Sequence, residues 1–383
     1  MIRSIRRVAV VGGGIGGAAV AALLQQAGFD ARVYEQAASF VPVGAGIHLS
    51  PNLVKVLDRI GAGEAVRIKG CRPGAFTNRD AATGEILFDL PLGDASLQAF
   101  NAPFLTLTRG DLLGAILDCV NPDSIEYGKR LSGVKRHSEQ VDLHFADGSE
   151  AQADLVIGAD GLRSKTREFL AGFEAPHYSG QVAFRGSYPT ALLGGERMED
   201  LTKWWATSTF ALTYYLDAAR DVFYFAAMTP QPSWPTDASF VPGDKSEMLE
   251  IFAGFHPAVQ RALRTAPPEC IKKWALFERP STFVWGDPRV ILLGDACHPM
   301  RPFMSQGAAM ALEDAAVLVR CLSESRSCEA AFDAYVATRS ERLLHVHEVS
   351  SQNTFMRMPC DPTWVFAYDP TRMPIQTGPI VTS

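Results

Sequence analysis

The chain has 383 residues, of which 47% are hydrophobic and 20% are charged. This length and composition predict two globular domains or one large composite domain. The formal net charge of −6 argues against nucleic acid as a partner and against attraction to an anionic membrane.

Three further features bear on the setting in which the chain works. No stretch reaches the roughly 18 consecutive apolar residues of a membrane span. The N-terminal arginines lead directly into a glycine-rich turn, without the apolar run of a signal peptide. The seven cysteines form no C-x-x-C pair, which argues against a disulfide framework and against a metal site. A cytoplasmic protein is therefore expected.

The first predicted elements form a dinucleotide-binding unit. An apolar strand over residues 8–11 leads into a glycine turn and a helix over 18–26, and a second strand ends at Glu35. The glycines with the G-x-G-x-x-G spacing are Gly12, Gly14 and Gly17. They allow a tight turn and a close approach of backbone to a pyrophosphate, which the helix N-terminus faces. Glu35 stands where a carboxylate binds ribose hydroxyls.

A loop and a set of strands follow this unit. Residues 40–52 contain two glycines and two prolines and predict an irregular, compact loop. His48 lies in this loop between two apolar residues, where a histidine is more often structural than functional. Residues 71–107 predict antiparallel strands, with a hairpin turn at 82–84, inserted into the dinucleotide-binding unit. The last strand delivers Arg109, a candidate for a phosphate or flavin contact or for a surface ion pair.

Two later strands end in carboxylates, at the edge where α/β sheets bind ligands. A strand over 153–157 is followed by Asp160, and a strand over 290–293 is followed by Asp295. A helix that begins at Gly307 presents its first N–H groups to an anion or a carbonyl oxygen.

The predicted fold class is α/β, with two domains. Residues 1–177 and 286–383 form a Rossmann-like domain with a parallel sheet, and the aromatic-rich residues 178–285 form an inserted antiparallel β-sheet domain that binds the substrate. A long helix over 330–349 supports the back of the first domain. The tail from residue 362 onward is expected to lie on the surface.

Three motifs in this order resemble those of single-component, FAD-dependent aromatic hydroxylases of the para-hydroxybenzoate hydroxylase fold. They are the glycine turn with Glu35, the Asp160-Gly161 motif and the Gly294-Asp295 motif. The resemblance spans nearly the whole chain. Within that group the chain is similar to 6-hydroxynicotinate 3-monooxygenases, and more distantly to salicylate and 3-hydroxybenzoate hydroxylases. The segments that carry the closer similarity are residues 44–48, 203–205, 214–215 and 294–300.

The resemblance implies a role for each matching residue, and no metal. His48 takes a proton from the substrate's hydroxyl group, and Tyr214 orients the substrate. Phe210, Phe303 and Leu201 belong to the substrate pocket, where the relatives carry two histidines and a cysteine, so a less polar ring is expected. The cofactor-binding residues are Gly12, Gly14, Gly16, Gly17, Glu35, Gln36, Arg109, Leu131, Asp160, Asp295, Pro302, Gly307 and Ala308.

The resemblance implies a flavin-dependent monooxygenase that hydroxylates a small hydroxylated aromatic or N-heteroaromatic acid, such as 6-hydroxynicotinate. FAD is the cofactor, NADH or NADPH is a transient co-substrate, and O2 reacts through a C4a-hydroperoxyflavin. CO2 leaves where the attacked carbon carries a carboxylate. The alternatives are a salicylate or hydroxybenzoate hydroxylase, a flavin dehydrogenase or oxidase without NAD(P)H, and a non-catalytic FAD- or NAD-binding regulator. A monomer or homodimer is expected.

Overall fold

The glycine-rich turn follows a central strand of a six-stranded sheet in the computed structural model, which describes residues 2, 5–42, 45–281 and 284–376. The strand order is β18-β19-β11-β1-β2-β7, and every neighbouring pair is parallel except β18 with β19. The strands are β1 (Arg7–Val11), β2 (Asp30–Glu35), β7 (Ile125–Tyr127), β11 (Leu155–Gly158), β18 (Gly286–Asp287) and β19 (Val290–Leu292). The predicted parallel sheet is confirmed.

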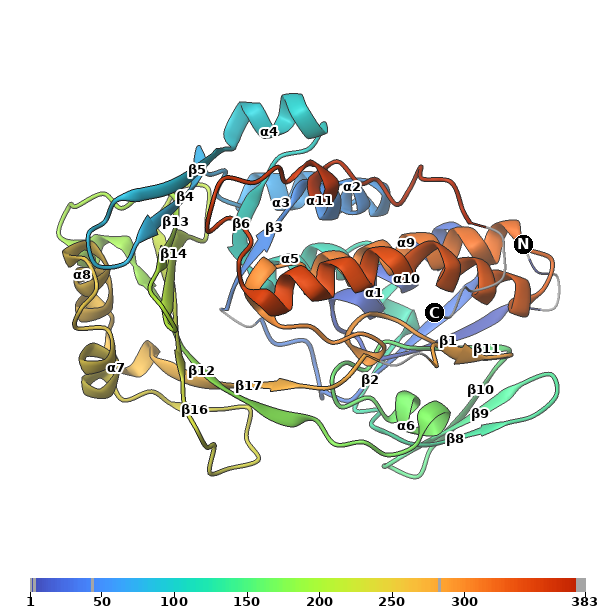
Figure 1. Ribbon diagram of the computed structural model, residues 1–383. Helices are drawn as coiled ribbons and strands as arrows, with labels where there is room; N and C mark the ends of the chain where they lie inside the picture. Colours follow the sequence, from blue (N-terminus) through green and yellow to red (C-terminus); the bar gives the residue numbers. More distant parts are fainter. Residues whose placement is uncertain (1, 3–4, 43–44, 282–283, 377–383) are drawn as a thin grey trace.

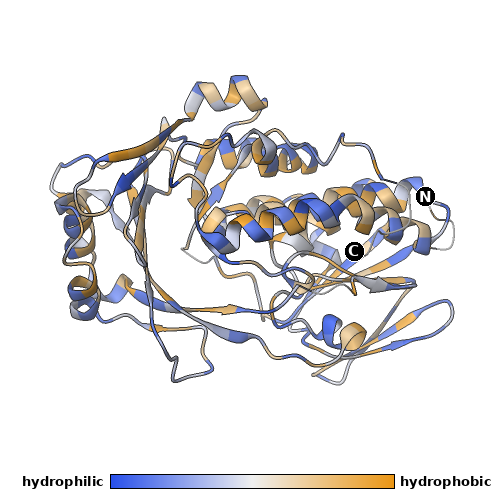
Figure 2. Ribbon diagram, in the orientation of Figure 1, coloured by the Kyte–Doolittle hydropathy of each residue, from blue (hydrophilic) through white to orange (hydrophobic). Residues whose placement is uncertain are grey.

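Helices cover this sheet and pack against one another (Figure 1). Helix α1 (Ile15–Gln26) follows β1 and packs on α5 (Arg109–Leu117) and α9 (Gly307–Glu324), and α10 (Cys328–Gln352) packs along α9. Figure 2 shows hydrophilic and apolar residues mixed along α10, whereas every residue of α9 from Ala309 to Val319 is buried. The predicted long helix over 330–349 is confirmed, because α10 spans these residues. The other helices beside this sheet are α2 (Pro51–Ile60), α3 (Gly63–Lys69) and α6 (Lys165–Ala171).

An eight-stranded sheet stands beside the parallel unit (Figure 1). Its order is β16-β17-β12-β15-β14-β13-β4-β5, and only β13 and β4 pair in parallel. Helices α7 (Lys245–Ile251) and α8 (Pro257–Thr265) cover its outer face over an aromatic core that includes Phe223 and Phe225. The strands are β4 (Ala75–Asp80), β5 (Ile86–Pro91), β12 (His177–Pro189), β13 (Leu201–Trp205), β14 (Phe210–Tyr215), β15 (Val222–Pro230), β16 (Phe240–Pro242) and β17 (Lys272–Glu278).

The hairpin of β4 and β5 belongs to this large sheet, because β4 pairs with β13. The structure also corrects the expectation of strands throughout residues 71–107, since α4 (Gly93–Phe100) is a helix. The division of the chain into domains at residues 177/178 and 285/286 stays a prediction.

The remaining strands form two small sheets. One has the order β10-β9-β8, formed by β8 (Leu131–Arg136), β9 (Val141–Phe145) and β10 (Glu150–Ala153). The other pairs β3 (Gly46–Leu49) with β6 (Leu105–Thr108). The loop expected over residues 40–52 is therefore wrong at 46–49, where His48 lies opposite Thr106 in a regular ladder. Gly44, part of the segment that carries the family resemblance, lies outside the described residues.

Five short 3-10 helices connect these elements in the described part of the chain. Two of them, η4 (Gly294–Ala296) and η5 (Pro302–Met304), lie between β19 and α9. The other three are η1 (Pro122–Ser124), η2 (Thr190–Leu193) and η3 (Pro268–Cys270). Over the ranges that the structure describes, no helix is long and apolar enough to cross a membrane. No group of three or more histidine, cysteine, aspartate or glutamate side chains is placed there to hold a metal ion.

Part of the C-terminal tail, from residue 362 onward, is buried in the fold. Residues Thr363–Phe366 form helix α11, in which the Phe366 side chain is buried. The Lys55 ammonium donates to the carbonyl oxygens of Phe366 and Ala367, at 3.0 and 2.9 Å. A helix end leaves its last carbonyl groups unpaired, and a cation from α2 fills that need here. The surface position expected for the tail is therefore wrong for this segment.

Candidate active site

A cavity of about 1030 Å³ lies between the carboxyl ends of the parallel strands and the inner face of the large sheet. It is larger than most small-molecule pockets. Two of the predicted site residues, Gly17 and Leu201, are not among those that line it. The predicted residues that do line it are Gly12, Gly14, Gly16, Glu35, Gln36, His48, Arg109, Leu131, Asp160, Phe210, Tyr214, Asp295, Pro302, Phe303, Gly307 and Ala308.

The glycine turn is shaped by two close approaches of backbone. Gly12 has a φ of 102°, and a Cβ there would lie 2.5 Å from the carbonyl oxygen of Ala159. A Cβ on Gly17 would lie 1.9 Å from the carbonyl oxygen of Gly12. Because Gly17 has no side chain, α1 can begin in direct contact with the turn. Gly17 is covered by the backbone of Gly12 and therefore does not line the cavity. Neither position tolerates a side chain without displacing the backbone.

Glu35 fixes the same turn from the neighbouring strand. Its carboxylate accepts hydrogen bonds from the backbone N–H groups of Gly13, at 2.6 Å, and Ala37, at 2.8 Å. The start of α1 at Gly14 has no side-chain cap, and the space around the Gly14 Cα is open. Free N–H groups at a helix N-terminus beside open space are suited to a phosphate.

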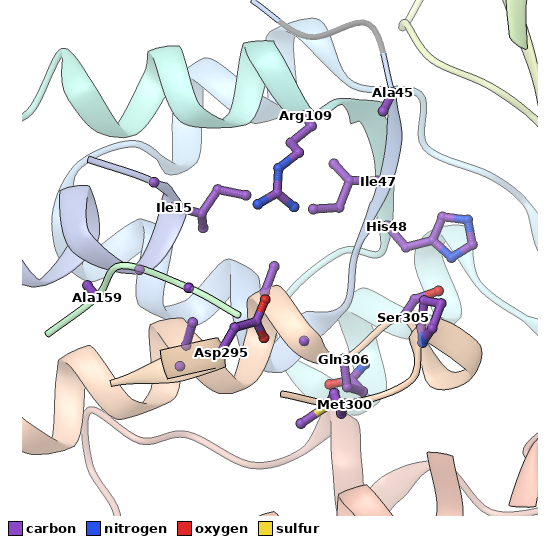
Figure 3. A pocket seen from close by; sticks show the side chains of 18 of the residues that line it. Ile15, Ala45, Ile47, His48, Arg109, Ala159, Asp295, Met300, Ser305 and Gln306 are labelled. Carbon is purple, nitrogen blue, oxygen red and sulfur yellow. The ribbon is translucent and has the colours of Figure 1, made fainter. Parts of the chain in front are cut away.

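Arg109 and Asp295 face the middle of the cavity. Figure 3 shows the Arg109 guanidinium reaching into it near Ile15 and Ile47, with the Asp295 carboxylate on the opposite wall. Neither side chain has a hydrogen-bond or ion-pair partner among the described residues. Burial raises the pKa of Asp295, while the Arg109 charge acts to lower it. A carboxylate and a guanidinium left free on facing walls are suited to a ligand with hydroxyl and anionic groups.

Asp160 lines the cavity, but its own loop occupies its carboxylate. That carboxylate accepts hydrogen bonds from the Ser164 hydroxyl, at 2.5 Å, and from the backbone N–H groups of Lys165 and Thr166, at 2.8 and 3.0 Å. Ser164 in turn caps helix α6 by accepting from the Arg167 N–H. The side chain therefore shapes the cavity wall, and a direct contact of Asp160 with a cofactor stays a prediction.

The loop before α9 closes the opposite end of the cavity. The backbone of Ser305 has a left-handed conformation, with a φ of 56°. The Gln306 side chain donates a hydrogen bond from Nε2 to the Ser50 hydroxyl at 3.1 Å. Asn52 donates to the Gln306 side-chain oxygen, also at 3.1 Å. The start of α9 has no side-chain cap. Its first N–H groups, near Gly307, are therefore available to an electron-rich group in the cavity.

A buried charge network holds this loop from behind. Arg339 of α10 pairs with Glu313 and Asp314 of α9, at 2.7 Å each, and all three side chains are fully buried. Asp314 also accepts from the backbone N–H of Gly294, at 3.1 Å, and lies 2.5 Å from Nε2 of His298. Although burial acts to raise the pKa of Asp314, the charges of His298 and Arg339 lower it to about 2. The carboxylate is therefore ionised, and it anchors the residues on either side of Asp295.

His48 and Tyr214 lie together where the cavity meets the large sheet. Their ring centroids are 4.6 Å apart, and the phenyl rings of Phe76 and Phe104 lie 5.8 and 5.6 Å from the imidazole. His48 is 3% exposed, and neither ring nitrogen has a hydrogen-bond partner. Burial and the nearby Lys203 charge lower the pKa of His48 to about 3. The ring is therefore neutral near pH 7 and keeps a lone pair for a ligand's hydroxyl group.

Gly46 gives Tyr214 its room. A Cβ on Gly46 would lie 2.4 Å from the Tyr214 hydroxyl oxygen, so β3 needs a glycine at this point. Burial, together with Tyr224, raises the pKa of Tyr214 well above its usual range. The phenol thus stays protonated and can donate a hydrogen bond into the cavity.

The substrate end of the cavity contains residues that sequence reasoning missed. The predicted pair Phe210 and Phe303 is in contact, with ring centroids 5.8 Å apart. Beside them the cavity is lined by Lys203 and Arg185, two cations from the inner face of the large sheet, and by Phe366 of the tail. A lysine inside the apolar-aromatic run of β13 was a usable signal for Lys203. Nothing in the local pattern could have brought the tail to this place.

Leu201 and Arg301 lie elsewhere. Leu201 is fully buried beside Tyr214, its partner across the β13–β14 ladder. Arg301, which lies between η4 and η5, pairs with Glu278 at 2.7 and 3.0 Å and does not line the cavity.

Comparisons with known proteins agree with this geometry. The FAD binding domain family matches residues 6–352. The chain is 43% identical to 6-hydroxynicotinate 3-monooxygenase of Bordetella bronchiseptica over 97% of each chain, and 44% identical to 6-hydroxynicotinate 3-monooxygenase of Pseudomonas fluorescens over 96% of each. The solved structure of Klebsiella pneumoniae HpxO complexed with FAD and uric acid superposes with a TM-score of 0.81 at 27% identity, covering 94% of this chain and 90% of that one.

The cavity fits the cofactor that this family binds. A dinucleotide needs an open helix N-terminus for its phosphates, polar partners along its length and an apolar compartment for its ring. The uncapped start of α1, the free side chains of Arg109 and Asp295, and the uncapped start of α9 supply the polar partners in one continuous space. The chain therefore belongs to the FAD-binding family and, within it, to the FAD-dependent aromatic hydroxylases.

Proposed function

We propose that this protein hydroxylates a small aromatic or N-heteroaromatic acid that already carries a hydroxyl group, at the expense of NADH or NADPH and O2. One observation carries the proposal. A neutral histidine with two unpaired ring nitrogens lies beside a protonated tyrosine, in the cavity that also holds the free Arg109 and Asp295 side chains. FAD supplies the redox and oxygen chemistry when it is bound, because no protein side chain does so.

The chain's own residues would hold that cofactor along the cavity. The Gly12–Gly14 turn and the start of α1 would take the pyrophosphate, with Glu35 and Gln36 at the adenosine end. Arg109, Leu131 and Asp295 would contact the middle, and Pro302, Gly307 and Ala308 would face the ring. The N-terminus of α9 would stabilise negative charge on that ring.

His48 and Tyr214 would prepare the substrate. A neutral imidazole can accept the proton of a ring hydroxyl, which pushes electron density onto the carbons ortho and para to it. The proton held at a His48 ring nitrogen returns to solvent after turnover. Tyr214 would donate a hydrogen bond that fixes the ring's orientation. Phe76 and Phe104 exclude water from the imidazole, which strengthens these polar contacts.

The pocket's side chains bear on which ring is accepted. Phe210 and Phe303 offer no hydrogen bonds, and a polar ring that meets them loses partners that it had in water. We therefore expect a ring less polar than the 6-hydroxynicotinate named for the two bacterial relatives. If the attacked carbon carries a carboxylate, the electron pair of the breaking bond stays with the ring and CO2 leaves.

A substrate panel tests this expectation. Hydroxybenzoates, including salicylate, and hydroxypyridines, including 6-hydroxynicotinate, are offered to the FAD-bound protein with NADH or NADPH. Consumption of the nicotinamide, peroxide release and CO2 release are then measured. A hydroxybenzoate should be oxidised with little peroxide. A clear preference for 6-hydroxynicotinate would contradict the role given to the Phe210–Phe303 pair.

A further inference from the structure

Two cations without a carboxylate partner, Lys203 and Arg185, line the cavity from the inner face of the large sheet. Lys272 of β17 pairs with Arg185 in the same row, but it is exposed and does not line the cavity. Residues paired directly across strands share a face, so the ladder registers place Asn78, Lys203, Leu212, Ala226 and Arg185 in one row over β4, β13, β14, β15 and β12. Lys203 and Arg185 stand three strands apart, roughly 14 Å between their backbones. The side chains between them are the apolar Leu212 and the small Ala226. They form an apolar part of the cavity wall with one cation at each side.

Lys203 is almost completely buried. It is 3% exposed, and its Nζ lies 3.7 Å from the centroid of the Trp205 ring and 4.4 Å from that of Phe210. Its hydrogen bonds are long and go to neutral oxygens, 3.4 Å to the Phe303 carbonyl and 3.2 Å to the Asn353 side chain. An ammonium group has three donors, and a buried one is normally paired with an anion. Nothing in the described part of the chain provides that anion.

The acidic residues of the cavity belong to other elements than the strands that carry Lys203 and Arg185. The four acidic residues that line the cavity are Glu35, Asp160, Glu168 and Asp295. All of them come from the parallel unit and its loops, and none comes from the eight-stranded sheet. Arg185 has no ion pair in the described ranges either, and its Nε is buried without a hydrogen-bond partner. The substrate end of the cavity is therefore positive.

We propose that Lys203 is the specificity residue that binds the anionic group of the substrate, a carboxylate on the aromatic ring, and that Arg185 adds to the attraction. This assignment rests on the proposed function. The aromatic rings hold the ammonium in place, and its remaining donor is free for the carboxylate. His48 lies in the same cavity, so one ring can present its hydroxyl group to His48 and its carboxylate to Lys203.

In the free protein, the surroundings of Lys203 disfavour the charged form of its amine. Burial lowers the pKa of the Lys203 amine well below its usual range, and the charge of Arg357 acts in the same direction. A bound carboxylate favours the charged form of the amine and offsets both effects. The same carboxylate would offset the Lys203 charge that acts on His48, and so would favour proton transfer to the imidazole.

Paired ligands that differ only in the carboxylate test the assignment. The probes are 6-hydroxynicotinate with 2-hydroxypyridine, and 4-hydroxybenzoate with phenol. Binding to the FAD-bound protein is measured by calorimetry without NADH, and kcat/KM is measured with it. Lys203→Gln removes the charge but keeps an amide that can donate to the Phe303 carbonyl. Lys203→Met is a second neutral variant, and Lys203→Arg keeps the charge.

We expect the neutral variants to bind the carboxylated rings about 10- to 100-fold more weakly, since charge-assisted hydrogen bonds are the strong ones. Binding of 2-hydroxypyridine and phenol should change by less than about threefold, and Lys203→Arg should keep most of the carboxylate preference. Lys272→Met is the matched control, because Lys272 is an exposed lysine of β17 that does not line the cavity.

The possible failures are distinguishable. If the neutral variants lose both members of each pair equally, or lose neither, the assignment of Lys203 is overturned, and a purely structural role explains an equal loss. If a neutral variant fails to fold, the Lys203→Arg variant serves as the test. Loss of its preference for the carboxylated rings overturns the assignment of Lys203 as well. Wild-type protein that hydroxylates none of the four rings would instead contradict the proposed function.

Discussion

Replacing His48 with glutamine should lower the rate of hydroxylation by roughly 10²- to 10⁴-fold, the range that a general base contributes. Glutamine fills a similar volume and can hydrogen bond, but it cannot take a proton. FAD should stay bound, because His48 lies at the substrate end of the cavity, away from the glycine turn. Reducing equivalents from NADH should then appear as hydrogen peroxide. Product, NADH and peroxide are measured in the same reaction.

His137→Gln is the control for this variant. His137 is exposed and pairs with Asp142 at 2.7 Å, away from the cavity, so its replacement should change neither rate nor coupling. If His48→Gln keeps the wild-type rate and releases no additional peroxide, His48 is not the base.

Replacing Arg339 with methionine should lower the free energy of unfolding by about 3–5 kcal/mol, the cost of leaving buried charges without their partner. Glu313 would keep Arg342, at 2.7 Å, and Asp314 would keep His298, but the shared cation in the dry core would be gone. Urea unfolding of the FAD-bound protein measures the loss. The Gly294 loop rests on Asp314, so FAD should also bind more weakly.

The matched control is Arg32→Met on the surface. The Arg32 side chain is 53% exposed and lies 3.8 Å from Glu126 and 3.9 Å from Asp30. Exposed ion pairs of this kind contribute at most about 1 kcal/mol. If Arg339→Met costs no more than Arg32→Met, the network does not hold the loop as described.

The sequence predicted the parts of the fold that are local. The β1–turn–α1–β2 unit follows from an apolar run, glycine spacing and a helical pattern that are adjacent in the chain, and the structure confirms it. The same holds for β19 and for the helix after Gly307. Each of these elements is specified by its own residues and needs no distant partner to be recognised.

Elements that depend on distant partners could not be predicted in this way. Strand β3 has four residues, and only its pairing with β6, nearly 60 residues later, distinguishes it from a loop. Helix α4 begins at Gly93 and follows a strand hairpin, so its short pattern resembled a further strand or turn. Tertiary context overrides weak local propensity in both cases.

The residues of the candidate site also fall into two groups, those that a local pattern predicts and those that depend on distant parts of the chain. The glycines, Arg109 and Asp295 could be named because each stands at the end of a recognisable strand, and all but Gly17 of these line one cavity. The role of Lys203 was hidden, because its two hydrogen-bond partners, Phe303 and Asn353, come from parts of the chain 100 and 150 residues away. The Arg339 network was hidden for the same reason, since it joins three helices and a loop.

The fate of labelled oxygen tests the central claim most directly. FAD-bound protein is supplied with NADH or NADPH, ¹⁸O2 and the compound of the substrate panel that is oxidised with the least peroxide. The mass of the product is then measured by mass spectrometry. Hydroxylation predicts one labelled oxygen atom in each product molecule and one nicotinamide oxidised for each product formed. A flavin that is bleached by substrate alone, or a ring product without the label, would contradict the account and indicate a dehydrogenase or oxidase.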